Sequence, residues 1–335
     1  RPFRAGQTPR HAADGRARPR HPRPGSLIYQ RMEKLYTKQA EARLEAGIDI
    51  WNRSVFERDA LGFSTRIFAQ ANLPHKAPKP GTELWVRRNG KAVFTIQPGA
   101  KANEDGTVTK LGFPYGTIPR LLLIYLVSEA VRTKAKRIDL GDSLSEFLRR
   151  VGLPRQGRTI QMLKKQMELL FAANMRFEFR DEAAGVQASM SGAVVNRHVL
   201  FWDTKHPEQQ SLWKNYVDLN SDFFEEIVAN GFPLDLDAVA ALRKSPLALD
   251  IYCWLSYRMK SIGRPTNIPW ESIHAQVGAD YGTVKDFRKK ALHALRLVRV
   301  VWPELTFATV KGCLTLIPSP TPVPPTPKAK TAKGE

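Results

Sequence analysis

Two segments of the chain combine a basic face with an apolar face at the spacing of an α-helix. In residues 158–173, the helical period of about 3.6 residues places the apolar side chains on one face. Arg158, Gln161 and Lys165 lie on the opposite face. In residues 283–297 the same spacing places Lys285, Lys289, His293 and Arg296 on the face opposite the apolar side chains. Arg and Lys pair with acceptors of guanine in the major groove, and Gln pairs with adenine. The two segments therefore predict helices that read DNA.

A basic face on one helix usually means only a solvated surface, so the setting of the two segments matters. Both lie at the same place in a repeated order of predicted elements. The first set is a helix over 118–135 with Thr117 as its N-cap, a short helix over 143–151, a turn, the basic helix, and strands over 175–180 and 193–202. The second set is a helix over 246–259, a short helix over 270–277, a turn, the basic helix, and strands over 298–302 and 313–317. This is the order of a winged helix.

The two sets also correspond residue by residue. Val151-Gly152 matches Val277-Gly278 at the end of each short helix, and Lys164-Lys165 matches Arg288-Lys289 on each basic helix. The apolar positions of the basic helices match as well, with Ile160, Leu163 and Phe171 answering to Val284, Phe287 and Leu295. Duplication of one unit explains this agreement better than chance similarity between amphipathic helices. We expect an α+β protein with two tandem winged-helix domains.

The wings of the two units supply further basic residues that could reach DNA phosphates. Arg180, Arg197 and His198 lie on the predicted strands of the first unit, and Lys311 precedes the last strand of the second. Such contacts add salt-dependent affinity without reading sequence. Of these we select Arg197 and Lys311 as DNA-binding candidates. The second basic helix carries more outward positive charge, opposed only by Asp286, whereas the first also exposes Met162 and Leu169. We therefore expect the second unit to supply most of the sequence-specific contact.

Composition changes divide the chain into five regions. Residues 1–31 are an Arg- and Pro-rich segment, expected to be disordered, and residues 318–335 are an extended, solvated Pro-rich tail. Residues 32–112 hold a predicted helix over 32–72, a hairpin over 83–97 around Asn89-Gly90, and a Gly-rich loop over 98–112. The two winged-helix domains are expected at 113–217 and 218–317.

The charge of the chain favours a polyanionic partner. Its formal net charge is +20 over 335 residues. Residues 1–25 and 318–335 carry eight of these charges, so the body between them still carries +12. Nucleic acid is the usual partner of such a surface. The longest apolar run, 121–127, is too short to cross a bilayer, and no apolar signal region follows the N-terminal charges, so we expect a soluble, cytoplasmic protein.

The search for a catalytic or metal site is negative. The chain has no P-loop motif, no His-x-His pair beside a Tyr and no clustered carboxylates. Cys253 and Cys313 have no ligand partners at metal-binding spacing, and Cys253 is predicted to be a core residue. The histidines are scattered. We expect no enzyme activity, no metal and no cofactor.

Several long motifs resemble those of the plasmid-encoded RepA-type replication initiators, over roughly residues 60–317. They are 113–123 (FPYGTIPRLLL), 129–133 (EAVRT), 140–147 (LGDSLSEF), 232–235 (FPLD) and 245–258 (SPLALDIYCWLSYR). Two shorter landmarks are 73–75 (LPH) and 88–90 (RNG). The turn at 154–159 (PRQGRT) departs from the family by containing less glycine, which puts phosphate contacts there in doubt.

The resemblance implies a tandem winged-helix protein that binds repeated origin sites in double-stranded DNA, helps to melt the adjacent duplex, and brings in the host replication initiator and helicase. It also implies that dimers repress the protein's own promoter while monomers bind the origin. The residues leave a second interpretation open, a winged-helix transcriptional repressor of a plasmid or phage operon. An array of short direct repeats beside an AT-rich stretch would favour the initiator, and a single inverted repeat the repressor. A nicking or primase-like enzyme is a more distant alternative.

Overall fold

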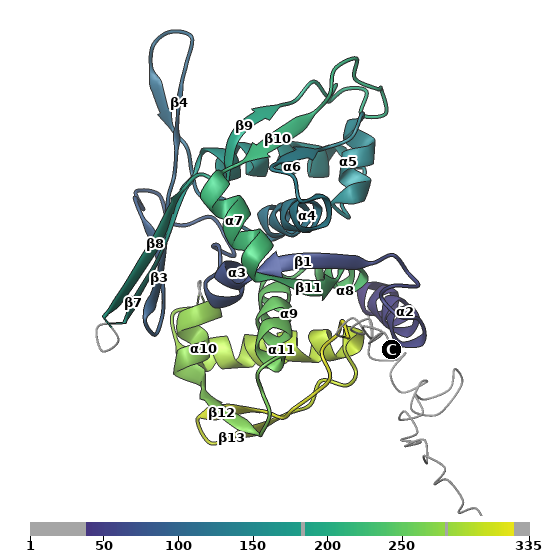
Figure 1. Cartoon of the computed structure of the whole chain (residues 1–335), viewed down its shortest axis with the longest axis vertical. Coiled ribbons are helices and arrows are strands. Elements are labelled where there is room, and N and C mark those ends of the chain that lie inside the picture. The colour runs from purple at the N-terminus through teal and green to yellow at the C-terminus, as the bar shows by residue number, and fades with distance from the viewer. Residues whose placement is uncertain (1–37, 182–184, 279–280, 325–335) are drawn as a thin grey trace, which may run out of the picture. The chain divides into compact units, whose positions relative to one another are not determined.

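The computed structural model describes residues 38–181, 185–278 and 281–324. The segment 1–31, expected to be disordered, lies outside the described residues. The chain divides into two units after Ala42, and the second unit contains all the elements discussed here except the start of helix α2 (Lys38–Asn52). The fold is mixed α+β (Figure 1).

The first repeated set of elements builds a small three-stranded sheet beside three helices. It consists of α4 (Thr117–Thr133), β6 (Arg137–Asp139), α5 (Leu144–Arg150), α6 (Gly157–Ala172), β9 (Val195–Val199) and β10 (Tyr216–Leu219). The strands pair antiparallel in the order β6-β10-β9. The third strand of the set thus lies between the other two.

The second set repeats this topology. It consists of α9 (Pro246–Met259), β12 (Thr266–Pro269), α10 (Trp270–Val277), α11 (Val284–Val301), β13 (Phe307–Val310) and β14 (Cys313–Leu316). Its strands pair antiparallel in the order β12-β14-β13, so the last strand is again the central one. Both sets are winged-helix-like in element order and in strand pairing. The predicted bounds of α9 and α10 are confirmed.

Local capping explains where several of these helices begin. The side chains of Ser143, Ser245 and Thr283 accept hydrogen bonds from backbone N–H groups three residues ahead, which satisfies donors that the helix itself leaves unpaired. For α4 the expected cap is wrong. Gly116, with φ of 79°, occupies the cap position, and Thr117 is already the first helical residue. The left-handed φ favours glycine at this entry to the helix.

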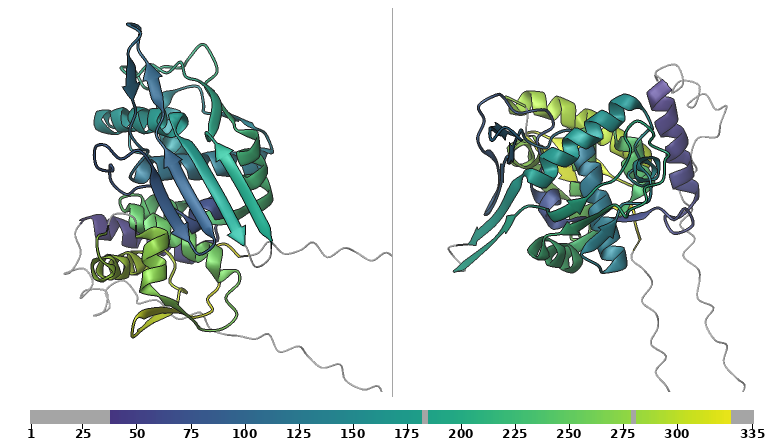
Figure 2. Two further views of the ribbon diagram at one scale, coloured as in Figure 1. Left: turned by 90° about the vertical axis from the view of Figure 1, so that its left-hand side faces the viewer. Right: turned by 90° about the horizontal axis from the view of Figure 1, so that it is seen from above.

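The predicted first wing is wrong in its first strand, whereas the second predicted strand, 193–202, contains β9 (Val195–Val199). The segment expected as its first strand forms β7 (Asn174–Asp181), which pairs with β3 (Ala92–Gln97) and β8 (Val186–Gly192) instead of entering the sheet of β9 and β10. With β2 (Trp85–Asn89) these strands form a four-stranded sheet in the order β2-β3-β7-β8 (Figure 2, left). The alternation of Met175 and Phe177 with charged residues identifies a strand but not its partner. The wing strands are β9 and β10.

The first strand expected in the second wing is also wrong. Residues 298–301 continue helix α11, because Val298 and Val301 extend its buried stripe with helical spacing. The run of β-branched valines suggested a strand, but the apolar period in this context is helical. The strand lies instead at β13, within the segment expected as a loop.

The N-terminal region differs from its prediction as well. The helix expected over 32–72 ends with α2, and β1 (Leu61–Thr65) and α3 (Arg66–Gln70) follow. β1 pairs antiparallel with β11 (Gly231–Asp235), which lies far along the chain. Thr65 pairs with Gly231, 166 residues later. On either side of β11 lie α7 (Ser221–Asn230) and α8 (Leu236–Leu242), which the sequence reading did not assign. The hairpin of β2 and β3 is confirmed.

Two segments expected to be irregular are ordered by pairing or packing. The predicted loop at 98–112 contains the short antiparallel pair β4 (Ala100–Ala102) and β5 (Val108–Lys110). The tail returns to the body as far as it is described. Trp302 Nε1 donates to the carbonyl of Pro320 at 3.0 Å, and Val323 is buried against Val55 and Ala60. The expectation of a wholly solvated tail is therefore wrong for residues 318–324.

Candidate nucleic-acid interface

Helix α6 presents the predicted polar face to solvent. Arg158, Gln161 and Lys165 are exposed, while Ile160 and Leu163 are buried on the opposite side. Lys164, which we did not select, is exposed on the same helix. The periodicity therefore predicted the orientation of this helix correctly. Leu169 is a correction, since it is only 5% exposed and belongs to the buried side.

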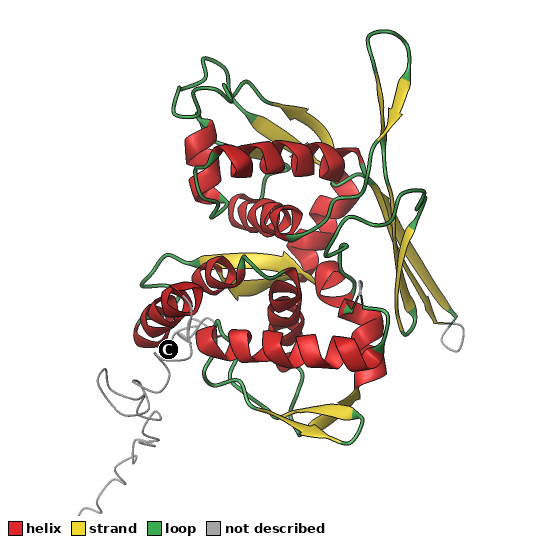
Figure 3. Cartoon of the chain, turned by 180° about the vertical axis from the view of Figure 1, so that it is seen from behind, coloured by secondary structure: helices red, strands yellow, loops and turns green. Residues whose placement is uncertain are grey.

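Helix α11 presents a larger basic surface. Lys285, Lys289, His293 and Arg296 are all exposed, opposite the buried Phe287, Ala291 and Leu295. In Figure 3, α6 and α11 are two long helices that run across the upper and the lower half of the molecule. Lys290 adds a further exposed cation that the sequence reading did not select. The exposed cations of α11 therefore lie along most of its length, with the imidazole of His293 between Lys290 and Arg296.

The one acidic residue near this face is engaged in capping. The Asp286 carboxylate accepts a hydrogen bond from the Thr283 hydroxyl at 2.8 Å, and the Asp286 N–H donates to that hydroxyl at 3.1 Å. A carboxylate at a helix N-terminus is favoured by the helix dipole. Asp286 therefore helps to form the start of α11.

The wing candidates are not brought together. Lys311 lies with Gly312, whose φ is 76°, at the tight turn between β13 and β14, so it stands at the tip of the second wing. Arg180 lies on β7, in the four-stranded sheet, where it forms an ion pair with Glu178 at 3.4 Å. It therefore does not belong to a wing.

Arg197 lies on β9 in register with Asp218 and Arg137, on the face of the sheet away from the buried Val217. Arg137 donates to both oxygens of Asp218 at 2.7 and 2.9 Å. These hydrogen bonds, with the charge of Arg197, hold the pKa of the Asp218 carboxyl below its ordinary value. His198 points to the other face, with its ring 5.2 Å from that of Phe171 on α6. Neighbouring wing residues thus face in opposite directions.

The loop between β9 and β10 carries a feature that the sequence reading missed. Leu212 is 96% exposed, and the nearby Phe201 and Trp213 are also exposed, with their rings 6.2 Å apart. The loop is held by the buried Asn215, whose side chain accepts from Phe201 N at 2.6 Å and donates to the carbonyl of Gly141 at 3.1 Å. The sequence signal for this exposed apolar surface was the two runs of large apolar residues, 200–202 and 212–213.

A buried ionic network joins the first helices of the two sets. Arg120 on α4 donates from Nε and Nη2 to the two oxygens of Asp250 on α9, each at 2.7 Å. Its remaining donors bond the carbonyls of Leu73, Pro74 and Gly116. His75 Nε2 lies 2.8 Å from Asp250 Oδ2. All five guanidinium donors are therefore used, which is the condition for burying such a charge.

The environment of Asp250 keeps it ionised. Burial raises the pKa of its carboxyl, but the charge of Arg120 and the hydrogen bonds from His75 and Arg120 outweigh burial and leave that pKa below its ordinary value. The network therefore fixes α4 against α9 and, through them, the helices α6 and α11 that pack beside them.

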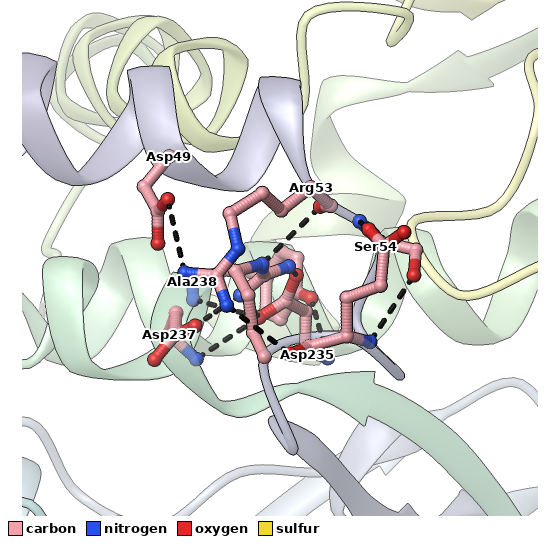
Figure 4. A network of polar contacts seen from close by, with 9 residues as sticks. Asp49, Arg53, Ser54, Asp235, Asp237 and Ala238 are labelled. Carbon is pink, nitrogen blue, oxygen red and sulfur yellow. Dashed lines mark hydrogen bonds and ion pairs between the residues drawn. The ribbon is translucent and has the colours of Figure 1, made fainter.

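A second partly buried network anchors β11 and α8. Asp235 caps α8 by accepting from the N–H groups of Asp237 and Ala238, and it accepts from Arg58 at 3.2 and 2.5 Å (Figure 4). Arg58 also forms an ion pair with Asp237. These contacts attach the segment before β1 to the strand that pairs with it. Their role is structural.

Among the described residues, no group of His, Cys, Asp and Glu is placed to hold a metal ion. The predicted core position of Cys253 is confirmed, and burial raises the pKa of its thiol, which disfavours the nucleophilic thiolate. Within the part of the chain that the structure describes, no helix has both the length and the apolar character needed to cross a membrane.

Comparisons with known proteins agree with the motifs. Residues 113–272 match the family model described as plasmid encoded RepA protein, which confirms the resemblance. A search of solved structures also found two crystal structures of domains 2 and 3 of RctB. The first, of the selenomethionine derivative, has a TM-score of 0.48 at 12% identity and covers 76% of this chain and 96% of its own. The second has a TM-score of 0.45 at 13% identity and covers 74% and 94%. No curated protein matches.

Proposed function

We propose that this chain, whose residues 113–272 match the RepA family, is a plasmid replication initiator that binds specific origin repeats in double-stranded DNA. The observation that carries the proposal is the pair of exposed basic helices, α6 and α11, at equivalent places in two winged-helix-like sets. In this interpretation, residues 113–217 and 218–317 are tandem winged-helix domains, preceded by the helix and hairpin region 32–112.

Each domain uses its basic helix in a major groove, as helix-turn-helix proteins do. Arg158, Gln161 and Lys165 of α6, and Lys285, Lys289, His293 and Arg296 of α11, are the residues proposed to meet base edges or phosphates. Lys311 at the tip of the second wing and Arg197 on strand β9 of the first wing add phosphate contacts. The second domain, with the larger basic surface, supplies most of the discrimination.

The ionic contact between Arg120 and Asp250 supports reading by both domains at once. Because this contact fixes α4 against α9, it limits the spacings that α6 and α11 can adopt. A protein with two reading helices at a set spacing recognises one composite site better than two independent sites. We propose that each origin repeat is such a composite site.

The direct experiment is footprinting of the full chain on its own plasmid. We expect protection of several short direct repeats beside an AT-rich stretch, with the footprint of each repeat spanning two successive major grooves. Protection of a single inverted repeat in a promoter would favour the transcriptional repressor instead. Uniform protection without sequence preference would contradict both. Metal-dependent cleavage of the supercoiled plasmid would point to an enzyme.

The host partners remain part of the proposal. Recruitment of the host replication initiator and helicase, opening of the adjacent duplex, and repression by a dimer follow from the family, and they can be tested in a reconstituted origin-opening reaction with the host proteins added one at a time.

A further inference from the structure

A hollow of about 540 Å³ lies against helix α6. Its walls come from α6, from the first wing and from the β4–β5 segment, and its apolar lining includes Ile160, Leu163, Met167, Phe171, Leu200 and Trp202. The volume lies within the range of about 300–1,000 Å³ that is typical of small-molecule sites. The hollow therefore has the size and lining of a ligand site, on the helix proposed to read DNA.

Phe171 on α6 and its counterpart Leu295 on α11 differ in their packing. Leu295 is 1% exposed, whereas Phe171 is 8% exposed and lines the hollow. Around Phe287, on the buried side of α11, the rings of Trp270, His274 and Tyr281 lie within 6.4 Å between centroids. The buried side of α11 is therefore closely packed with aromatic rings.

The charged residues that line the hollow are mostly basic. Lys101, Lys164 and His198 are among the lining residues, and the only acidic one, Glu168, pairs with Lys101 at 3.4 Å. After that pairing, Lys164 is left as an exposed cation next to an apolar cavity. A ligand that satisfies both features has an apolar body and one anionic end.

We propose that this hollow binds a free single-chain amphiphilic anion of the fatty-acid class. The acyl chain packs against Met167, Phe171 and Trp202, where burying each methylene contributes about 0.8 kcal/mol. The carboxylate lies beside Lys164. A two-chain phospholipid in a bilayer does not suit a hollow of about 540 Å³.

Occupancy would act on DNA reading, a consequence that rests on the proposed function. Lys164 directly precedes Lys165 on α6, so an anion held there lowers the positive potential of the face that meets DNA. Coupling between two sites is reciprocal. The amphiphile should therefore weaken specific DNA binding, and DNA should weaken binding of the amphiphile by the same factor.

The binding experiment uses the full chain without DNA. Dodecanoate is titrated by calorimetry, and displacement of anilinonaphthalene sulfonate is followed by fluorescence. We expect one saturable site per chain, with dodecanol binding more weakly because it lacks the charge. Thr204 lines the hollow, so Thr204→Trp places a large side chain there and should abolish binding. Lys164→Ala should weaken dodecanoate about tenfold, the loss of one charge-assisted contact, while Lys214→Ala, an exposed lysine outside the lining, should not change it.

The outcomes separate this proposal from the proposed function. The proposal is overturned if the chain shows no saturable site, or if it binds only to vesicles of anionic phospholipid. It is also overturned if Lys214→Ala weakens dodecanoate binding as Lys164→Ala does. Circular dichroism checks whether Thr204→Trp is folded. If it is not folded, the effect of the surface variant Lys164→Ala on dodecanoate binding tests the site independently. If the chain binds dodecanoate but no specific DNA, the proposed function fails and the ligand site stands.

Discussion

The Arg120 guanidinium and the Asp250 carboxylate meet in a buried two-point contact, 130 residues apart in the chain, with both N···O distances at 2.7 Å. Each residue lies on the first helix of one of the two repeated sets. The contact therefore couples the stability of the protein to the arrangement of its two basic helices, α6 and α11.

Removing one partner of this pair should be costly. Arg120→Ala leaves Asp250 buried without its counter-charge, and a broken buried ion pair typically costs about 3–5 kcal/mol. We expect a loss of this size in the free energy of unfolding, measured by urea denaturation. Arg137→Ala, which breaks the exposed pair with Asp218, is the matched control and should cost about 1 kcal/mol or less. Equal losses for the two variants would contradict a special role for Arg120.

The same pair should make stability depend on acid pH. The pKa of Asp250 is lower in the folded protein than its ordinary value, so its contribution to stability is fully present above the unfolded-state pKa. That contribution is lost as the pH falls below about 4 and through the folded-state pKa. Urea denaturation between neutral pH and pH 3 should show this decline. In Asp250→Asn the decline should be smaller; an unchanged slope would assign the acid sensitivity to other carboxylates.

The motif at 113–123 should be structural. Leu122 on α4 is almost completely buried in the main core, so Leu122→Ala should cost about 2–5 kcal/mol through the cavity it leaves. Thermal unfolding measures this loss. If the melting temperature stays constant while binding to a host protein disappears, the motif is an interface and the structural assignment fails.

Binding to DNA should fall steeply with salt. The body of the chain keeps a large positive charge, and contact with about six phosphates predicts a slope near −5 for log K against log salt concentration. Filter binding or fluorescence anisotropy on the footprinted site, over several salt concentrations, measures the slope. A flat response on that site would exclude phosphate neutralisation as the source of affinity.

The two basic helices should differ in what they read. A side chain that contacts a base costs about 1–3 kcal/mol when removed and relaxes preference at one position, whereas a phosphate contact weakens all sequences alike. We expect Lys285→Ala and Lys289→Ala to reduce discrimination between specific and scrambled DNA, and Lys165→Ala to reduce affinity for both. The reverse result would transfer the reading role to α6. If none of the three variants changes binding, neither helix lies in the groove.

Local sequence determined α9 and α10 and the sides that the two basic helices expose. The Ser245 cap, followed by Pro246, predicts the start of α9, and both ends of α9 and α10 agree with the structure. The exposure of Lys165 and Lys289 opposite Leu163 and Phe287 follows from the helical period alone. These features depend on residues within a few turns of one another, so a window of the sequence contains their physical cause.

Only the tertiary structure decided which distant segments meet. The alternation in β7 predicts a strand, yet nothing near it in sequence shows that β3 is its partner, and the same holds for β1 with β11 and for Arg120 with Asp250. The valines at the end of α11 satisfy both helix and strand patterns until packing in the core selects the helix. Partner choice depends on which apolar faces and buried charges complement each other across the whole chain, and that complementarity is expressed only when the chain is folded.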